Sequence, residues 1–586
     1  MPASRATRLV FVIILLAAAA TLAPAPAAAI DFPLGDTLTV IRRPLLNIPA
    51  IVQPGDTLRI HCAAAPGTTG WQAELRFGDL LVPLTVLGAS YDPSTLWWTL
   101  DARLPGACLH ELYNLRVAAS GGVDDVTSNA VRVIPAFRED WYFVHVTDPH
   151  LPDHTFSSSG GQPEDSTEMV DMRAVIEDIN LMNPEFVLLT GDLVNEGELE
   201  DYLEWRAYSR SQLLLTELEV PVYLTSGNHD LGGWDATPPP DGTARRNWWR
   251  FFGWPRLDAP PPGAPWYTQN YSFDYGPVHF TGLEAYINYD GWRYGTYGGE
   301  SFTSGQMDWL AGDLAATAAD AKVVFHHYDF KGQLDLEALG LDMSLWGHIH
   351  RDQGSISHHP FDLATNNVCN GERAYRVIRV SGSTLTPQAT VSAGYDGGAM
   401  RLQFSPANDG THATISALVG NEHPLRFEHG LVKFRMPKGA ADPQLSAGTI
   451  LQVDTAPAGW DTYYVELDIA PDWWGTVTLT VTEPTAVAGG EAPAVAAELA
   501  ANHPNPFNPT TTLPFHLPRA GRARLSVFDA AGRPVAVLVD GEFAAGWHRA
   551  EWRGRDGAGR ELPTGVYLAR LEAGGVVRTR KMLMMR

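Results

Sequence analysis

Basic side chains are scarce in this chain of 586 residues, where 42 Lys and Arg face 67 Asp and Glu and the formal net charge is -25. Nucleic acids and anionic membranes bind broad basic surfaces, so we expect no stable partner of either kind. A small phosphorylated substrate is compatible with this charge, because a bound metal ion can dominate the local electrostatic field. The acidity therefore excludes some partners without excluding phosphate chemistry.

Charged residues of both signs are also few, at 19%, whereas hydrophobic residues reach 45% and aromatic residues 10%. That apolar content is ample for folded cores and excludes global disorder. The chain is rich in Gly (55) and Pro (43). This composition favours β-sandwiches and loop-rich structure over helical bundles or coiled coils.

Long apolar runs are absent except near the N-terminus, where residues 9–23 are mostly apolar and rich in Ala. This run is short for a membrane span. Arg5 and Arg8 precede it and small residues at 27–29 follow, which is the order of a secretory signal peptide. We expect cleavage after Ala29 and a secreted or cell-surface protein; the alternative is an uncleaved anchor.

Cysteine is rare, with Cys62, Cys108 and Cys369 in the whole chain. The first two could form a disulfide in an oxidising compartment, or they could remain buried thiols. Cys369 is left without a partner, and no feature of the sequence indicates a catalytic role for it.

The length predicts several domains, and the pattern of the residues changes along the chain accordingly. Short alternating segments indicate β-sandwiches, and strands that alternate with helices indicate an α/β domain. A stretch rich in Ala and Gly, without periodicity, indicates a linker. The expected order is a signal peptide at 1–29, an Ig-like β-sandwich at 30–136, an α/β domain at 137–384, a second β-sandwich at 385–484, a linker at 485–502 and a small C-terminal β-domain at 503–586.

Polar residues cluster directly after the expected strands of the α/β domain. In such sheets, ligands bind in the crevice beyond the carboxyl ends of the strands. Side chains two positions apart on an extended backbone point the same way, so the pairs Asp148/His150 and His348/His350 can each converge on one site. The clusters are Asp148-Pro-His150, Gly191-Asp192, Gly227-Asn228-His229-Asp230, His326-His327 and Gly347-His348-Ile349-His350.

Carboxylate, amide and imidazole groups in these clusters form a donor set that suits Mn, Fe or Zn and lacks the thiolates of structural zinc sites. Between the third and fourth clusters, residues 232–265 are rich in Trp, Pro and Gly without helical or strand periodicity. We interpret this segment as a loop at the mouth of the site, whose aromatic residues either pack on the domain or contact substrate.

The order of these clusters resembles that of the calcineurin-like metallophosphoesterase family, over residues 141–380. The resemblance implies a four-layer αββα core with a two-metal centre, flanked here by Ig-like β-sandwich domains. By the same resemblance, Asp192 bridges two ions. The first ion would be held by Asp148, His150, Asp192 and His350, and the second by Asp192, Asn228, His326 and His348.

One ligand position is less secure than the others. His326 is preferred to His327 because the family's ligand comes first after the strand. The Pro that usually follows two residues later is Tyr328 here, so His327 stays open as the alternative.

The resemblance also implies a reaction, in which a metal-activated hydroxide attacks phosphorus in line with the leaving group. His229 would stabilise the transition state or protonate the leaving oxygen. Asp230 would orient His229 or, equally, cap a helix. The position of the tyrosine ligand of purple acid phosphatases is Asn195 here, and residues 191–195 are more similar to the phosphodiesterase-type branch. We therefore expect a phosphodiesterase; the alternatives are a phosphomonoesterase and a non-catalytic surface binding protein.

The C-terminal segment has a resemblance of its own. The run His503-Pro-Asn-Pro-Phe507, with Gly546-Trp-His and Gly565-Val-Tyr567 further on, is similar to the sorting domains of type IX secretion, which have a flagellar hook-capping, Ig-like fold. It implies that the secretion machinery is a partner and that the protein passes the outer membrane; the alternative is a plain Ig-like adhesion module. This segment carries 13 Lys and Arg against 7 Asp and Glu, so the acidity lies elsewhere in the chain.

Overall fold

The computed structural model describes two compact units of the chain, one within Leu34–Pro484 and one within Thr485–Arg586. The expected signal peptide, most of the expected linker and the His503-Pro-Asn-Pro run lie outside the described residues. The described residues are 37–584, without 153–166, 196–204, 232–242, 254–268, 286–299, 395–398, 484–496, 500–501, 503–506, 508, 518, 530–532, 545, 564 and 575.

The N-terminal module of the first unit is an 8-stranded sheet that runs in the order β1-β3-β6-β5-β4-β7-β8-β2 around one core. Its strands alternate between buried and exposed residues; in β3, for example, Leu58, Ile60 and Cys62 point inward. Cys62 and Cys108 are both free thiols here. The bounds are β1 (Ile41–Arg43), β2 (Ala50–Val52), β3 (Thr57–Ala63), β4 (Gln72–Phe77), β5 (Leu80–Asp92), β6 (Trp97–Arg103), β7 (Leu112–Ala119) and β8 (Val123–Val133).

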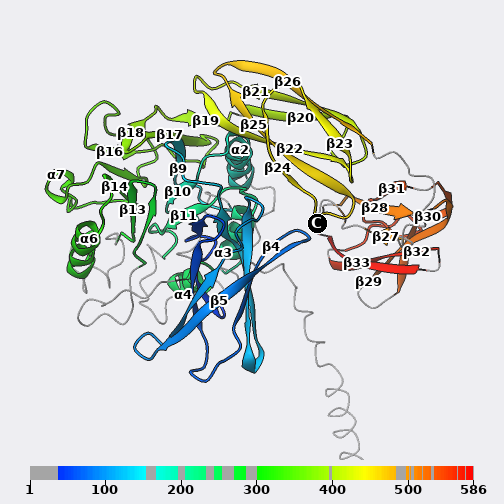
Figure 1. Cartoon of the computed structure of the whole chain (residues 1–586), viewed down its shortest axis with the longest axis horizontal. Coiled ribbons are helices and arrows are strands. Elements are labelled where there is room, and N and C mark those ends of the chain that lie inside the picture. Colours follow the sequence, from blue (N-terminus) through cyan, green and yellow to red (C-terminus); the bar gives the residue numbers. More distant parts are fainter. Residues whose placement is uncertain are drawn as a thin grey trace, which may run out of the picture. The chain divides into compact units, whose positions relative to one another are not determined.

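Two mixed sheets make up the α/β module, and Figure 1 shows them beside each other in green and teal. The first has the order β11-β10-β9-β17-β18, in which β9, β10 and β11 are parallel and β17 is antiparallel to β9. The strands are β9 (Asp140–Val146), β10 (Val187–Thr190), β11 (Val222–Thr225), β17 (Ala374–Ser381) and β18 (Thr384–Pro387), with β19 (Val391–Ser392) paired to β17.

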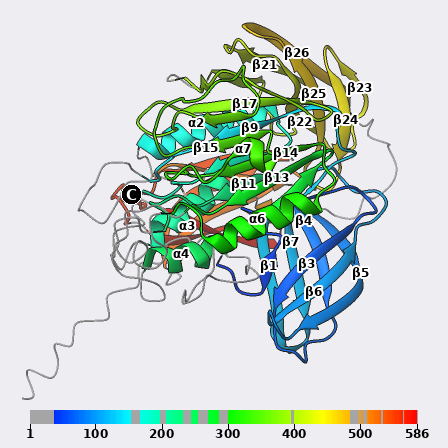
Figure 2. The same ribbon diagram turned by 90° about the vertical axis from the view of Figure 1, so that its left-hand side faces the viewer.

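The second sheet has the order β12-β13-β14-β15-β16, and its last four strands are parallel. The strands are β12 (Tyr271–Tyr275), β13 (Val278–Leu283), β14 (Ala321–His326), β15 (Met343–Trp346) and β16 (Phe361–Ala364). The helices of the module are α2 (Thr167–Met182), α3 (Trp205–Leu215), α4 (Thr243–Phe252), α6 (Ser304–Ala316) and α7 (Leu336–Leu339), and Figure 2 shows α6 crossing in front of β13 and β14.

An aromatic core lies between the two sheets. Phe143 of β9 meets Phe280 of β13 edge-to-face at 5.3 Å, and Tyr223 of β11 stacks on Phe273 of β12 at 3.6 Å between ring centroids. The other face of the first sheet packs on α2, α3 and α4, whereas Leu310 and Leu314 of α6 share a core with β13 and β14. The expected mixture of an α/β module and β-rich modules is confirmed, with helices outside and sheets inside.

Most of the expected elements of this module are present, because their hydrophobic pattern has the right period. The expectation for residues 232–265 is wrong in part, since α4 forms a helix within it. Trp248 and Phe252, four residues apart, lie on one buried face of α4 and contact each other at 4.6 Å. Trp248 is completely buried and its Nε1 donates to Gln269 Oε1, which supports the packing role of that aromatic residue.

A second pair of sheets follows the α/β module, with the orders β20-β21-β26-β23 and β22-β25-β24. Their apolar residues belong to the same core as α2, so this β-module is packed directly on the α/β module. The strands are β20 (Met400–Ser405), β21 (Thr414–Asn421), β22 (Phe427–Pro437), β23 (Ala441–Leu445), β24 (Thr449–Asp454), β25 (Trp460–Ile469) and β26 (Trp473–Thr482).

The second compact unit consists of two sheets around one core, with the orders β27-β28-β31 and β30-β29-β32-β33. Among the described helices of the chain, none has the length and apolarity needed to cross a membrane. The strands of this unit are β27 (Glu498–Leu499), β28 (Thr511–Leu517), β29 (Gly521–Asp529), β30 (Pro534–Phe543), β31 (Gly546–Trp552), β32 (Gly565–Ala573) and β33 (Val576–Met584).

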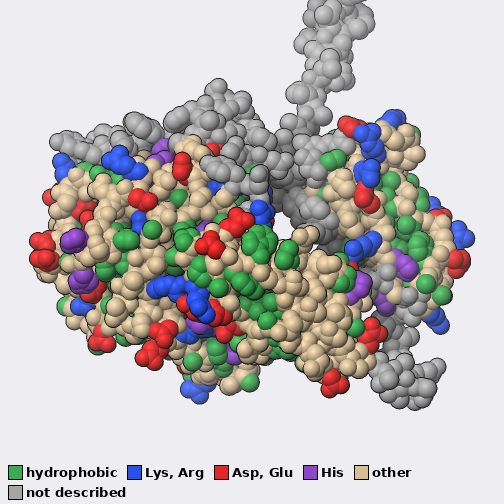
Figure 3. All heavy atoms as spheres, turned by 90° about the horizontal axis from the view of Figure 1, so that it is seen from above, with side chains coloured by type: hydrophobic (Ala, Val, Ile, Leu, Met, Phe, Trp, Pro, Cys, Tyr) green, Lys and Arg blue, Asp and Glu red, His purple; other side chains and the backbone are tan. Residues whose placement is uncertain are grey.

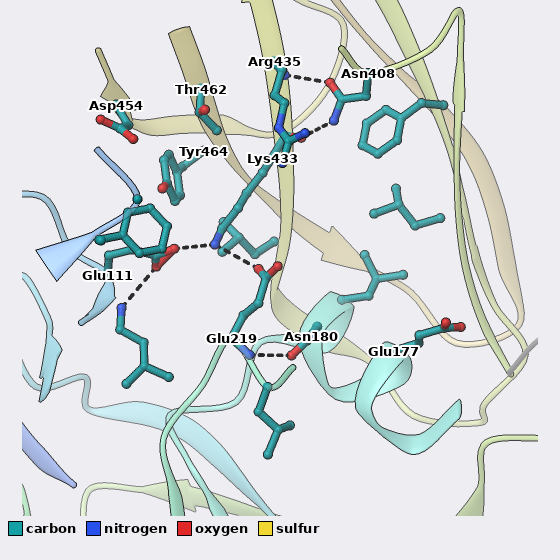
Figure 4. Close-up of a pocket in the computed structure, with 18 of the residues that line it drawn as sticks. Glu111, Glu177, Asn180, Glu219, Asn408, Lys433, Arg435, Asp454, Thr462 and Tyr464 are labelled. Carbon is teal, nitrogen blue, oxygen red and sulfur yellow. Dashed lines mark hydrogen bonds and ion pairs between the residues drawn. The ribbon is translucent and has the colours of Figure 1, made fainter. Parts of the chain in front are cut away.

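Lys433 of β22 joins the three modules of the first unit electrostatically. Figure 4 shows its amine between Glu111, which precedes β7, and Glu219, which precedes β11. Glu111 is 2% exposed, and the surrounding cavity of about 1140 Å³ is lined by all three modules. Burial alone would lower the pKa of Lys433, but the two carboxylates raise it above its ordinary value, so the amine is held in its charged form.

Replacing Lys433 with Met should lower the free energy of unfolding of the first unit by about 3 kcal/mol, because Glu111 then stays buried without its main counter-charge. Guanidinium denaturation followed by tryptophan fluorescence measures this change. The matched control is Arg426→Ala in the same module, which removes an exposed ion pair with Asp468 and should change stability little. Equal effects of the two substitutions would contradict the role of Lys433.

Candidate metal centre

The polar residues that follow β9, β10, β11, β14 and β15 meet at one edge of the two sheets. Hydrogen bonds between the loops hold this edge together: the backbone N–H of Asp148 donates to Gly191 O, and that of His150 donates to Asp192 O at 2.9 Å. The backbone N–H of Gly347 donates to His327 O in the same way. Strand ends that are distant in the sequence therefore bring their side chains to one place.

Two of the motif glycines are required by this close approach. A Cβ atom on Gly227 would overlap the carboxylate and the backbone of Asp192. A Cβ atom on Gly347 would overlap the hydroxyl of Thr147 and the carboxylate of Asp148. Glycine at these positions lets the backbone of one loop touch the carboxylate carried by another.

The backbone of several candidate ligands lies in the left-handed region. Their φ values are 52° for Asp148, 49° for His150, 49° for Asp192, 70° for His348 and 50° for His350. Each such residue costs on the order of 1 kcal/mol or more, and this conformation persists only where the surrounding structure enforces it. Strain that is concentrated on these residues marks the strand ends as a functional site.

Asp148, His150 and His350 form the first donor group. Nε2 of His350 lies 3.0 Å from Nε2 of His150 and 3.4 Å from Oδ1 of Asp148. The other oxygen of Asp148 accepts hydrogen bonds from Thr147 Oγ1 at 2.7 Å and from the backbone N–H of His348 at 2.9 Å. The side chains are buried except for His350, which is 27% exposed. Their donor atoms thus face a common small volume.

The second donor group lies on the far side of Asp192. Oδ2 of Asp192 is 3.1 Å from Nε2 of His327 and 3.7 Å from Nε2 of His150, so Asp192 stands between the two groups. Nδ1 of His348 is 3.2 Å from Nε2 of His327 and 3.2 Å from Oδ1 of Asn228. The resemblance implies that Asp192 bridges two ions, and that role stays a prediction for a carboxylate that lies between the two groups.

His326 does not take part in the second group as expected, because it is still inside β14 and points away from the strand ends. Its Nε2 faces Ser344 Oγ at 3.2 Å, and its ring packs edge-to-face on Phe302. His327 faces the second group instead, with Nδ1 donating to Thr190 O at 2.7 Å and Nε2 turned to Asp192. The alternation of a strand sends neighbouring side chains in opposite directions, so only one of the two can reach the site.

His229 lies next to the first group, with its ring edge-to-face on His150 at 4.7 Å. Its backbone N–H donates to Oδ1 of Asp192 and its ring Nδ1 donates to Asn195 O. Among the described residues, the carboxylate oxygens of Asp230 accept from the backbone N–H groups of Val194 and Gly227, each at 2.8 Å, and not from the ring of His229 or from the first turn of a helix. Asp230 therefore braces the loops after β10 and β11.

The electrostatics of the site combine negative charge on the carboxylates with imidazoles that are neutral except for His327. Burial would lower the pKa of His327, but the charge of Asp192 raises it to about 9. Burial would raise the pKa of Asp148, but the His350 imidazole, 3.4 Å from its Oδ1, and the charge of His327 lower it to about 2. Burial would likewise raise the pKa of Asp192, which His327 and His229 hold well below its usual range. Burial lowers the pKa of His150 to about 3 and that of His348 to about 4. Ionised carboxylates and neutral imidazoles are the forms that bind metal ions, so His327 would release its proton to an ion that binds there.

The residues present fit a divalent metal cofactor. Buried Oδ1 of Asp148 has no hydrogen-bond donor among the described residues, although a carboxylate oxygen in such a place ordinarily has one. The ligand atoms of His150, Asp192 and His229, and those of Asp192, His327 and His348, lie within 4.8 Å of one another. An ion among them would supply the positive charge that the orphaned oxygen lacks.

Sequence reasoning missed residues that orient these donors. Asn195 Oδ1 lies 2.9 Å from Nδ1 of His150, which leaves the Nε2 of that ring for an ion. Tyr328, at the position where the family has Pro, stacks on His348 at 4.8 Å between ring centroids. Cys369 lies 4.0 Å from Nδ1 of His350. Two of these residues had a visible signal in the sequence: Asn195 stands at the position of the purple acid phosphatase tyrosine, and Tyr328 at the position of the family's Pro.

Comparison with protein families agrees with this geometry. Residues 142–352 match the model of the calcineurin-like phosphoesterase family. The match covers less than half of the chain, and it supports a hydrolytic phosphoesterase activity for the domain that carries the two donor groups. No curated protein sequence matches the chain.

Solved structures of low sequence identity are similar to parts of the chain. A purple acid phosphatase from yellow lupin (Lupinus luteus) seeds has 13% identity and a TM-score of 0.31, over 62% of this chain and 70% of that one. A dimetal phosphatase from Danio rerio has 14% identity and a TM-score of 0.31, over 41% of this chain and 92% of that one. Zinc-complexed Vps29 from Entamoeba histolytica has 10% identity and a TM-score of 0.19, over 47% of this chain and 92% of that one.

His327→Ala should weaken metal binding by more than about 100-fold, which is beyond the loss expected for a residue that only orients a ligand. His326→Ala is the matched comparison, since it removes an adjacent buried imidazole that faces Ser344. Metal content after loading with Mn or Zn and gel filtration, with circular dichroism to verify folding, measures both variants. Loss of metal in His326→Ala together with retention in His327→Ala would reverse the assignment.

Proposed function

We propose that the chain is a secreted, metal-dependent phosphoric ester hydrolase that acts on phosphodiesters. The observation that carries this proposal is the convergence of two donor groups on the two sides of one buried carboxylate, Asp192. A shared carboxylate suits a pair of ions about 3.5–4 Å apart, the spacing of two-metal phosphatases and nucleases. The residues that would hold the pair are Asp148, His150, Asp192, Asn228, His327, His348 and His350.

The metals that suit this mixture of nitrogen and oxygen donors are Mn, Fe and Zn. When bound, such ions polarise phosphoryl oxygens and lower the pKa of a water molecule toward neutrality. Other residues of the chain orient the imidazole rings that would bind these ions. Asn195 and the carbonyl of Thr190 hold the rings of His150 and His327 in the orientation that presents Nε2.

His229 is the residue that we assign to proton transfer. Its hydrogen bonds to Asp192 and Asn195 place the ring beside the first donor group. A protonated imidazole there can donate to the leaving oxygen or stabilise the charge that develops on it, a contribution worth roughly 100- to 10,000-fold in rate. The ring's Nδ1 is taken by Asn195 O, so the proton would leave from Nε2.

A phosphodiester is preferred over a monoester as substrate on two grounds. The run at residues 191–195 is more similar to phosphodiesterases, and Asn195 contacts His150 at the place where a purple acid phosphatase has its tyrosine ligand. In the described part of the chain, Asp148, Asp192 and Asn228 contact imidazoles, backbone N–H groups and Thr147 rather than Lys or Arg. A diester carries one negative charge fewer than a monoester and needs less cationic support.

We assign the packing of helices outside and sheets inside to the four-layer αββα core, flanked by Ig-like β-sandwich modules. Export and surface sorting through the secretion machinery are part of the same proposal, supported by the N-terminal apolar run and by the basic C-terminal unit. Figure 3 shows acidic and basic side chains interspersed on one face of the described chain, which suits a small substrate better than a nucleic acid or a membrane.

Purified protein loaded with Mn, Fe or Zn should hydrolyse bis-nitrophenyl phosphate faster than the mono ester. Asp192→Asn should lose metal and, with it, turnover by more than about 100-fold on both substrates. His229→Ala should keep its metal and lose turnover by about 100-fold or more. Rates on the two substrates, with metal content measured on the same samples, test these expectations.

Each alternative function has its own outcome in that experiment. A faster rate on the mono ester would make the chain a phosphomonoesterase of the same fold. Full metal binding with no hydrolysis of either ester, or of cyclic nucleotides and glycerophosphodiesters, would favour a non-catalytic surface binding protein. Unchanged hydrolysis by Asp192→Asn would contradict the two-metal proposal itself.

Deleting residues 503–586 should leave the protein in the periplasm of its host, whereas the full chain should be outside the cell or on its surface. The truncated chain should keep its hydrolytic activity, since the candidate ligands all lie within Leu34–Pro484. Cell fractionation with immunoblotting, together with N-terminal sequencing to locate the start expected at Ile30, measures both. Equal export of the two chains would leave the C-terminal unit as an adhesion module.

A further inference from the structure

Cys369 is a completely buried thiol in the turn between β16 and β17. The turn is attached to the end of β9, because the backbone N–H of Cys369 donates to Asp148 O at 3.3 Å and that of Val368 donates to Thr147 O at 3.1 Å. The sulfur is thereby held against the strand that carries Asp148 and His150. Cys369 itself belongs to none of the five motif clusters.

A second set of contacts makes this turn rigid. Asp171 of α2 is buried, and its carboxylate accepts from the backbone N–H of Gly371 and from Nε of Arg373, each at 2.7 Å. Within the turn, Asn367 Nδ2 donates to the carbonyl oxygen of Cys369 at 2.8 Å. A buried carboxylate paired with a guanidinium is costly to break, so the sulfur is fixed in place.

The sulfur of Cys369 faces one edge of the His350 ring, and the first donor group faces the other. Nδ1 of His350 lies 4.0 Å from Sγ, whereas Nε2 lies 3.4 Å from Oδ1 of Asp148. That oxygen is buried and lacks a hydrogen-bond donor among the described residues, which independently indicates an ion on the Nε2 side. An imidazole that binds a metal through Nε2 carries its proton on Nδ1 and needs an acceptor there.

We propose that Cys369 is a positioning residue for the first metal: its sulfur accepts the Nδ1–H of His350 and directs Nε2 of that ring toward the ion. This inference rests on the proposed function. The sulfur also accepts amide N–H groups from Asn367 at 3.1 Å and Asn370 at 3.3 Å, and these contacts hold it in place beside the ring. His150, His350 and Cys369 also have ligand atoms within 4.8 Å of one another, which makes direct ligation by sulfur the competing arrangement.

Cobalt titration separates the two arrangements. Cys369→Ala should weaken the binding of one of two Co²⁺ ions by about 10- to 100-fold, the loss typical of a group that orients a metal-binding His. Cys369→Ser, which keeps an acceptor, should restore most of that affinity. The unaltered protein should show cobalt d–d bands without a thiolate-to-cobalt charge-transfer band in the near ultraviolet.

Cys62→Ala is the matched control, since it removes another buried thiol that lies in the core of the N-terminal module. It should leave both cobalt affinities unchanged. Equal cobalt affinities in the unaltered chain and in Cys369→Ala would overturn the role of Cys369 and leave the proposed function standing. A charge-transfer band that disappears in Cys369→Ala would overturn it in favour of direct ligation, and a chain that binds no cobalt at all would overturn both proposals.

Discussion

The constraint on which the rest of this structure depends is the burial of two carboxylates, Asp148 and Asp192, at one edge of the sheets. An ionised carboxylate is costly to bury unless charges or hydrogen bonds compensate for it. Here the compensation comes from the imidazoles of the strand-end residues and from backbone N–H groups of neighbouring loops. One oxygen of Asp148 remains without a donor among the described residues, and a cation meets that need best.

This requirement explains features that are unfavourable by themselves. Left-handed backbone at Asp148, Asp192 and His350 costs free energy, yet it occurs at the residues that carry the donor groups. The rigid aromatic core between the two sheets supports that strain, because the strands cannot relax individually. Farther from the site, Lys433 of the second β-module pairs with Glu111 of the N-terminal module and Glu219 of the α/β module. These ion pairs link all three modules of the unit that contains the site.

Much of the α/β module was predictable from local pattern, as α2 illustrates: Met172, Val175 and Ile179 repeat at helical spacing and are all buried. Helix α4 was not predictable in this way. Its ten residues stand within a segment rich in Gly and Pro, and its buried face is defined by Gln269 and the neighbouring helix rather than by a long period. Short elements depend on tertiary burial more than on their own propensity.

For the site, the sequence by itself determined the chemical types of the donors and their order along the chain, because each cluster follows a strand and strand ends converge. Only the folded chain shows which of His326 and His327 faces Asp192: His326, the last residue of β14, is turned to Ser344, whereas His327, just after the strand, contacts Asp192. The folded chain also shows that the Asp230 carboxylate accepts from the backbone N–H groups of Gly227 and Val194, and that Cys369 lies beside His350. Such contacts join residues that are far apart in the chain, so they cannot be predicted from the periodicity or spacing of a local segment.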